Sequence, residues 1–414
     1  MRQNRNNKSK CKGSAVQVIR EIQEYNVGRD PERLQLKYQK MRSTQFGFLR
    51  ATSHIFYGRW ATGQVVKSAP LTWVCGDLHV ENFGSYKGNN RLAYFDINDF
   101  DEAALVPSSW ELVRMLTSLY VAGEGLSISQ SETGDLCSVF LNSYASSLAS
   151  GKAYWIETET APGIIKDLLV GLKDRQRSQF LATRTVLKGK TRTFKVDGKR
   201  ALPVTAAQRT SVMNMMARFA KTQAEPDFFR VLDVARRIAG TGSLGIDRFS
   251  ILVNGKGTTK GHYLLDLKQS RASSVAPYFD ALQPKWRSEA HRIVEIQQRM
   301  QAVSVALLQP VHFGESTYVL RELQPLEDRV VLNRSYQTRG ELKIVIETMG
   351  RMLAWAQLRS AGRANSAIAD ELIDFGNRTK WREKLLAASR DMSTQVRKDV
   401  LAFNAAYDSG AFEV

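Results

Sequence analysis

Four side chains between residues 73 and 102 have the types and the spacing that phosphoryl transfer requires. Asp77 lies five positions before Asn82 in GDLHVEN, and Asp96 and Asp99 follow within FDINDFDE. In phosphoryl transfer one carboxylate orients the attacking hydroxyl, while an amide oxygen and a second carboxylate hold Mg²⁺ against the phosphates. The alternative interpretation is that Asp and Asn only fill a tight turn, as these residues often do.

Short apolar segments flank these residues and must position them. Residues 71–74 and 92–95 have the apolar character of strands, and the stretch between them contains a turn rich in Gly and Asn. This pattern predicts a hairpin-like pair of strands with the polar residues near its ends. We expect His79 to brace the loop through a backbone bond, because Mg²⁺ prefers oxygen ligands to imidazole nitrogen.

The spacing of Asp77 and Asn82, followed by a strand that ends in Asp-Phe-Asp, resembles the protein-kinase-like superfamily in its aminoglycoside-phosphotransferase-like branch. The resemblance implies that Asp77 is the catalytic base and that Asn82 is a catalytic-loop residue that binds magnesium. It makes Asp99 the main metal aspartate, with Asp96 as the alternative. One departure is Cys75, since relatives often have His or Arg before the Gly-Asp pair. This departure leaves open how the loop is braced.

A glycine-rich segment in the second half of the chain resembles the flap over the phosphates of a kinase. The candidate nucleotide-binding residues of this segment are Gly240, Thr241, Gly242, Ser243 and Gly245. A G-x-G-x-x-G match alone is weak, and in a dinucleotide-binding fold the third glycine would open a helix. Here a β-branched strand follows instead, then an Asn-Gly turn and a second strand that carries Lys268. By resemblance, Lys268 contacts the α- and β-phosphates.

The next expected element is a helix over residues 285–307. It offers Glu289 and Glu295 as carboxylates that could pair with Lys268. We prefer Glu295, because a lone charge in the middle of a mostly apolar helix needs a partner.

The strand that follows this helix resembles the one that leads into the adenine-binding hinge of a kinase. By position the hinge consists of Glu322, Leu323 and Gln324. The order of the parts is unusual, because the catalytic loop precedes the glycine-rich segment instead of following it. A circular permutation explains this order, with its break between the helix over residues 341–360 and the catalytic loop.

Four longer motifs make the resemblance more specific. They are STQFGFLR, CGDLHVENFG, FDINDFDE and DVARRIAGTGSLG. Together they resemble an uncharacterised bacterial family, domain of unknown function 2252, over about residues 40–360. The expected fold is α+β, a bilobal protein-kinase-like fold in circularly permuted order with a mostly helical large lobe. The expected parts are a basic disordered tail (1–14), the first part of the large lobe (15–235), a β-rich nucleotide-binding lobe (236–325) and the helical remainder of the large lobe (326–414).

Composition sets the limits on class and partners. The chain has 414 residues and a formal net charge of +18, which indicates acidic partners such as nucleotides and leaves nucleic acid open. Its three cysteines, Cys11, Cys75 and Cys137, are odd in number and far apart, which argues against a disulfide framework. No run reaches transmembrane length and no apolar signal core follows the basic start, so we expect a cytoplasmic protein.

The function predicted from these patterns is an ATP- and Mg²⁺-dependent phosphotransferase that acts on a hydroxyl of a small molecule or protein. The alternative is a nucleotide-binding or nucleic-acid-binding regulatory protein without turnover. Its contact surface would be the strongly basic segment 166–200. Two further charges were notable. Arg50 interrupts an apolar cluster and could reach the site or form a structural pair, and Glu111 could support the catalytic loop or only meet its own helix dipole.

Overall fold

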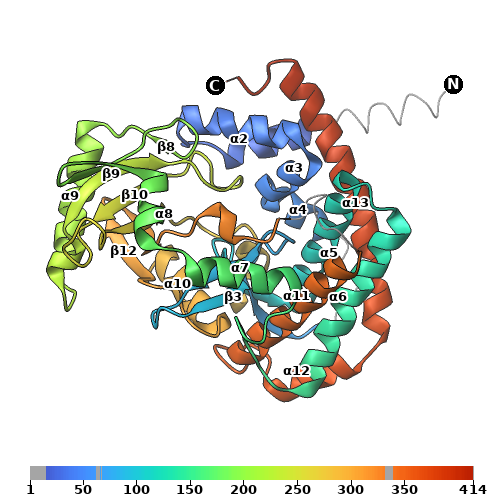
Figure 1. Cartoon of the computed structure of the whole chain (residues 1–414). Helices are drawn as coiled ribbons and strands as arrows, with labels where there is room; N and C mark the ends of the chain where they lie inside the picture. Colours follow the sequence, from blue (N-terminus) through green and yellow to red (C-terminus); the bar gives the residue numbers. More distant parts are fainter. Residues whose placement is uncertain (1–14, 62–65, 67, 332–338, 414) are drawn as a thin grey trace.

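The computed structural model describes residues 15–61, 66, 68–331 and 339–413. Within these residues the chain is a mixed fold of helices and antiparallel sheets, with the largest sheet on one side and most helices on the other (Figure 1). The predicted tail over residues 1–14, with Cys11, lies outside the described residues. Cys75 and Cys137 are buried free thiols.

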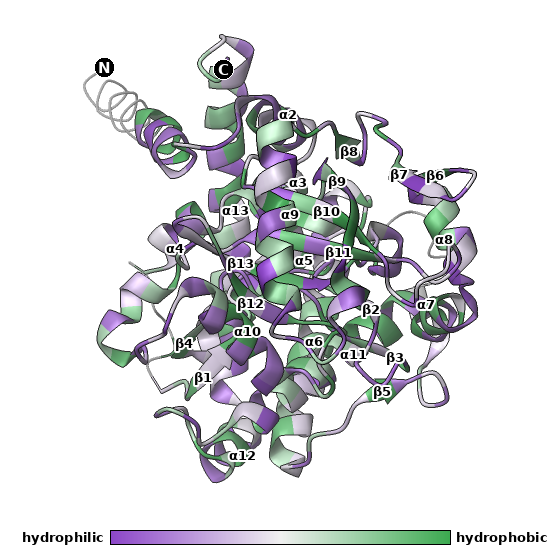
Figure 2. Cartoon of the chain, turned by 90° about the vertical axis from the view of Figure 1, so that its left-hand side faces the viewer, coloured by the Kyte–Doolittle hydropathy of each residue, from purple (hydrophilic) through white to green (hydrophobic). Residues whose placement is uncertain are grey.

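A six-stranded antiparallel sheet carries the glycine-rich segment and Lys268. In spatial order its strands are β12 (Gln309–Phe313), β13 (Ser316–Glu322), β11 (Tyr263–Gln269), β10 (Arg248–Val253), β9 (Val231–Arg237) and β8 (Ala201–Leu202). Helix α9 (Ala206–Ala220) lies across one face and shares an apolar core with the strands (Figure 2). The expected boundary between the lobes at residue 236 falls inside β9, and β8, which comes before that boundary, belongs to the same sheet.

Helix α10 packs beside β12 and β13. It spans Glu289–Met300, shorter than the expected 285–307, because Ser288 caps its start by accepting the backbone N–H of His291.

The larger apolar core is formed mainly by helices. These helices are α3 (Gln45–Ala51), α4 (Ser53–Trp60), α5 (Ser108–Gly125), α6 (Gln130–Ser150), α7 (Gly163–Asp174), α11 (Arg339–Ser360), α12 (Ala369–Asn377) and α13 (Lys380–Asp408). All residues of α5 from Ser108 to Gly123 are buried. Helix α5 begins at Ser108, directly after Pro107, and has no side-chain cap.

Two nested antiparallel pairs support the catalytic stretch. Strand β1 (Leu71–Val74) pairs with β4 (Ala104–Pro107), while β2 (Phe83–Lys87) pairs with β3 (Ala93–Ile97), which also pairs with the short β5 (Ile156–Glu157). The predicted pairing of residues 71–74 with 92–95 is therefore wrong, because β1 pairs with β4, and β3 pairs with β2 and β5. The arrangement brings the loop after β1 next to the loop between β3 and β4.

The remaining elements are shorter or lie outside the sheets and helices described above. They are a helix over 15–25, α2 (Pro31–Ser43), α8 (Arg177–Arg184), β6 (Thr185–Lys188), β7 (Thr191–Phe194) and 3₁₀ turns at Pro226–Phe229, Ala276–Leu282 and Leu326–Asp328. No helix in the described part of the chain combines the length and the apolar character that a membrane crossing needs.

Candidate active site

The catalytic loop is fixed to helix α5 by Glu111. Its Oε1 accepts the backbone N–H of Cys75 at 2.7 Å and that of Gly76 at 3.1 Å. Gly76 has φ +82°, and a Cβ there would collide with the backbone of Glu102, so the tight approach requires glycine. Glu111 is fully buried, and burial raises its pKa to about 7 against the lowering effect of these hydrogen bonds. Bracing of the loop at Cys75 thus comes from a carboxylate on α5.

Asp77 forms an ion pair with Arg114, which sequence analysis missed. Arg114 Nε and Nη2 both donate to Asp77 Oδ1, at 3.0 and 2.7 Å, and Nη2 also donates to the carbonyl of Leu49. Burial raises the pKa of Asp77, and Arg114 opposes that shift. The available signal was an arginine among apolar residues on the predicted helix, three positions after Glu111.

Asn82 joins the catalytic loop to the segment after β3. Its Nδ2 donates to the carbonyl of Asp77 at 3.4 Å and to that of Asp99 at 3.1 Å. Its Oδ1 is buried and has no hydrogen-bond partner among the described residues. As expected, His79 braces the loop, since its Nδ1 accepts the backbone N–H of Glu81 at 3.2 Å.

Lys268 of β11 reaches the acidic segment between β3 and β4. Its ammonium contacts the Asp101 carboxylate and lies 3.6 Å from Asp99 Oδ1. Burial pushes the pKa of Asp99 up, but Lys268 and Arg329 lower it, and the net result is a pKa below the usual range. Two segments more than 160 residues apart in the sequence therefore meet here.

The expected partner of Lys268 is wrong. Glu295 pairs with Arg299 at 3.2 Å on its own helix, and Glu289 pairs with Arg292 at 2.6 Å. Each helical glutamate has an arginine three or four residues later on the same face, so a local pair forms and Lys268 is left for Asp101.

Asp96 does not line the cleft and lies in the protein interior. Its carboxylate accepts the backbone N–H groups of Ile97 and Ala302 and lies 3.6 Å from Arg359. These contacts occupy both oxygens, which contradicts the alternative that Asp96 takes the metal role.

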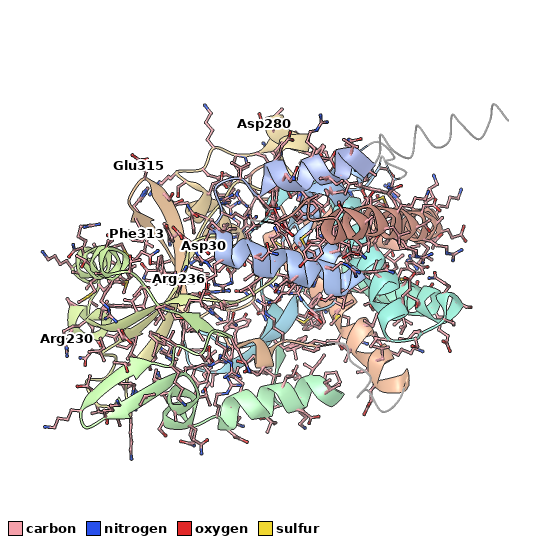
Figure 3. All side chains as sticks on the ribbon, turned by 90° about the horizontal axis from the view of Figure 1, so that it is seen from above. Asp30, Arg230, Arg236, Asp280, Phe313 and Glu315 are labelled. Carbon is pink, nitrogen blue, oxygen red and sulfur yellow. The ribbon has the colours of Figure 1, made fainter. Side chains whose placement is uncertain are left out.

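The glycine-rich loop between β9 and β10 is held from outside by the residues around the start of α2. Arg29 Nη1 donates to the carbonyls of Gly242 (2.7 Å) and Leu244 (2.8 Å). The backbone N–H of Asp30 donates to the carbonyl of Gly245 (2.8 Å). Asp30 also pairs with Arg236 of β9 at 3.0 Å (Figure 3). These contacts stabilise the loop in one conformation, and no sequence pattern indicated them.

The expected hinge uses its polar groups within the protein. The backbone N–H of Leu323 donates to Leu264 at 2.9 Å, and the carbonyl of Gln324 accepts Arg237 Nη2 at 2.6 Å. The Glu322 carboxylate contacts Arg91 at 2.6 Å. The Leu323 amide and the Gln324 carbonyl are therefore not free for adenine in this conformation, which contradicts their expected role.

A buried charge cluster lies behind the glycine-rich strands. Asp266, two positions before Lys268, accepts from Arg248 Nε at 2.8 Å, lies 2.8 Å from Arg237 Nη1 and 3.8 Å from Arg321 Nε. Burial raises the pKa of Asp266, but the three guanidinium groups hold it well below the usual range. One carboxylate thus shares three cations.

A single cleft contains the carboxylates and the glycine-rich loop. Among its lining residues are Asp77, Asp99, Asp101, Gly240, Thr241, Gly242 and Ser243. The described residues contain no group of three or more His, Cys, Asp or Glu side chains arranged to hold a metal ion. Mg²⁺ needs fewer protein ligands when phosphates complete its coordination shell. The Asp99 carboxylate, together with Asn82 Oδ1, which has no partner among the described residues, therefore fits this ion.

Comparisons with known proteins support one assignment. The model of the family described as "Uncharacterized protein conserved in bacteria (DUF2252)" matches residues 29–406, a longer range than the expected 40–360. No curated protein and no solved structure matches the chain. Because the family model covers most of the sequence, this chain belongs to the DUF2252 family of uncharacterised bacterial proteins.

Proposed function

We propose that the protein is an ATP- and Mg²⁺-dependent phosphotransferase that acts on a hydroxyl group. The observation that carries this proposal is that Asp77 and Asp99 line one cleft together with the glycine-rich loop, while Asn82 and Lys268 both contact Asp99. Phosphoryl transfer needs positioning and charge stabilisation more than covalent chemistry, and these groups supply both.

Each residue has a separate task in this proposal. Asp77 accepts the hydroxyl proton, while Arg114 holds one of its oxygens and so fixes the orientation of the other. Asn82 Oδ1 and Asp99 hold Mg²⁺, which neutralises charge on the phosphates when it is bound. Lys268 contributes a positive charge on the glycine-loop side. The bond from the acceptor oxygen to the γ-phosphorus forms as the bond to the bridging oxygen breaks, and ADP leaves.

The order of the parts along the chain supports a permuted kinase-like arrangement. In chain order from β9 the parts are the glycine-rich loop, Lys268, α10, the segment at 322–324 and α11. The chain after α11 then passes beside β1, where the backbone N–H of Ala367 donates to Leu71 at 2.7 Å. A short connection from there to the catalytic loop would restore the usual order, as a circular permutation requires.

A second candidate is a nucleotide-binding protein with little or no turnover. Its support is the occupied hinge and the Asp77–Arg114 pair, because the guanidinium opposes the rise that burial causes in the pKa of Asp77. The nucleic-acid version has less support, because many cations of segment 166–200 already have carboxylate partners. These pairs are Lys173–Glu159, Arg175–Asp328, Arg177–Glu322, Arg184–Glu327 and Arg200–Glu327.

The deciding experiment measures ATP consumption by the wild type and by Asp77→Asn, with nucleotide binding measured in parallel. The enzyme reading predicts a turnover loss of about 10²–10⁴-fold with binding retained, and loss of turnover when Mg²⁺ is chelated. Equal turnover in both proteins contradicts the role of Asp77. Binding without turnover in the wild type supports the second candidate.

A further inference from the structure

The outer part of the cleft is lined by arginines that the proposed chemistry does not use. Arg29, Arg50 and Arg271 line the same cleft as Asp77, and Arg271 comes from the segment just after β11. Arg50 pairs with Glu81, so its charge is neutralised. Arg29 and Arg271 have no carboxylate within ion-pair distance among the residues that the structure describes.

Arg29 is buried with hydrogen-bonding capacity left over. Its side chain is 6% exposed, and its Nε has no partner in the described part of the chain. Burial, together with the nearby Arg271, lowers the pKa of Arg29 to about 10 against the opposing effects of Tyr25 and Glu102. Two like charges side by side in a recess are unfavourable unless an anion completes the site.

The acid that faces these arginines is already occupied. Glu102 Oε1 accepts the Tyr25 hydroxyl at 3.2 Å, and Oε2 accepts the backbone N–H and the hydroxyl of Ser274. These bonds direct the carboxylate oxygens toward Tyr25 and Ser274. Arg29 Nη1 already donates to the carbonyls of Gly242 and Leu244, so the other N–H groups of Arg29 and the guanidinium of Arg271 are the positive groups left to bind a ligand.

We propose that Arg29 and Arg271 form an anion subsite, and that the acceptor is a small hydroxylated compound with a carboxylate or phosphate group. The anionic group would bind the arginines while the hydroxyl faces Asp77 in the same cleft. The proposed function enters this inference only in the statement of which end of the compound reacts. Guanidinium groups suit both anions, because they bind carboxylate and phosphate in a forked geometry.

The test is calorimetric titration of the full chain with inorganic phosphate and, separately, with acetate, at constant ionic strength. The proposal predicts that at least one anion binds the wild type and that Arg271→Gln weakens its binding about tenfold or more. Arg287→Gln removes an exposed arginine outside the cleft and should change nothing. Arg271→Lys keeps the charge and should give an intermediate affinity, which a folding defect would not. The anion that binds more tightly identifies the acceptor group.

A repeat of the titration with saturating Mg²⁺ and a non-hydrolysable ATP analogue separates the subsite from the nucleotide site. Retained anion binding supports an acceptor subsite, whereas competition assigns the arginines to the nucleotide phosphates and overturns the proposal. Absent binding to the wild type, or equal binding to Arg271→Gln, also overturns it. Failure of the proposed function has a different signature, namely intact anion binding with no Asp77-dependent ATP turnover.

Discussion

Glu111 should make the stability of the protein depend on pH in a way that one substitution removes. Its folded pKa is about 7 and its usual value is 4.5, because the side chain is fully buried. Between these two pH values the folded state keeps a proton that the unfolded state releases. The contribution of Glu111 protonation to the unfolding free energy is therefore fully present below pH 4.5. It is lost as the pH rises to 7, which lowers the unfolding free energy by about 3 kcal/mol at 1.36 kcal/mol per pH unit.

Glu111→Gln should abolish this contribution to the pH slope while leaving the brace in place. Gln keeps one carbonyl oxygen for the backbone N–H groups of Cys75 and Gly76 but cannot ionise. Its amide replaces Oε2, which has no described partner, so we expect a constant cost of about 1–3 kcal/mol at every pH. The slope, and not this offset, tests the reasoning.

Urea unfolding followed by tryptophan fluorescence at pH 5, 6, 7 and 8 gives the measurement. From pH 5 to pH 8 the difference in unfolding free energy between wild type and Glu111→Gln should move by about 2.5 kcal/mol in favour of the variant, because most of the change lies between pH 5 and pH 7. Glu295→Gln is the matched control, because Glu295 is partly exposed in a local helix pair. A parallel pH dependence in wild type and Glu111→Gln would refute the raised pKa.

Three further outcomes follow from the same contacts. Asp101→Asn should lower ATP turnover about tenfold or more, because Lys268 loses its closest carboxylate, whereas Glu295→Gln should leave turnover unchanged in the same assay. Asp266→Asn should lower the unfolding free energy by about 3–5 kcal/mol in urea titrations, since three buried arginines lose their shared counterion. Binding of nucleic acid through segment 166–200 would make the affinity fall steeply as the salt concentration rises. Because cations of this segment are already in ion pairs, we expect the measured affinity to depend only weakly on salt.

Local patterns in the sequence predicted most of the elements and the family. The strand and turn signals after the glycine-rich segment correspond to β10 and β11, and the periodic helix at 341–360 corresponds to α11. The family match extends over residues 29–406. Such features depend on neighbouring residues in the chain, so short-range patterns are sufficient to reveal them.

Pairing between distant side chains was predicted less well. The partner of Lys268 was expected on the following helix and is Asp101. The hinge was expected to present free backbone groups, but Arg237 and Leu264 occupy them. The strand at residues 71–74 pairs with β4 and not with the strand at residues 92–95.

The sequence by itself determined which residue types are present at which spacing, and therefore which chemistry the chain can attempt. Tertiary structure alone decided that Arg114 holds Asp77 and that Asp96 is buried away from the cleft. It also placed Arg29 and Arg271 beside the catalytic loop. The physical reason is that a charge pairs with whatever folding brings within a few ångströms, and spacing along the chain does not encode that distance.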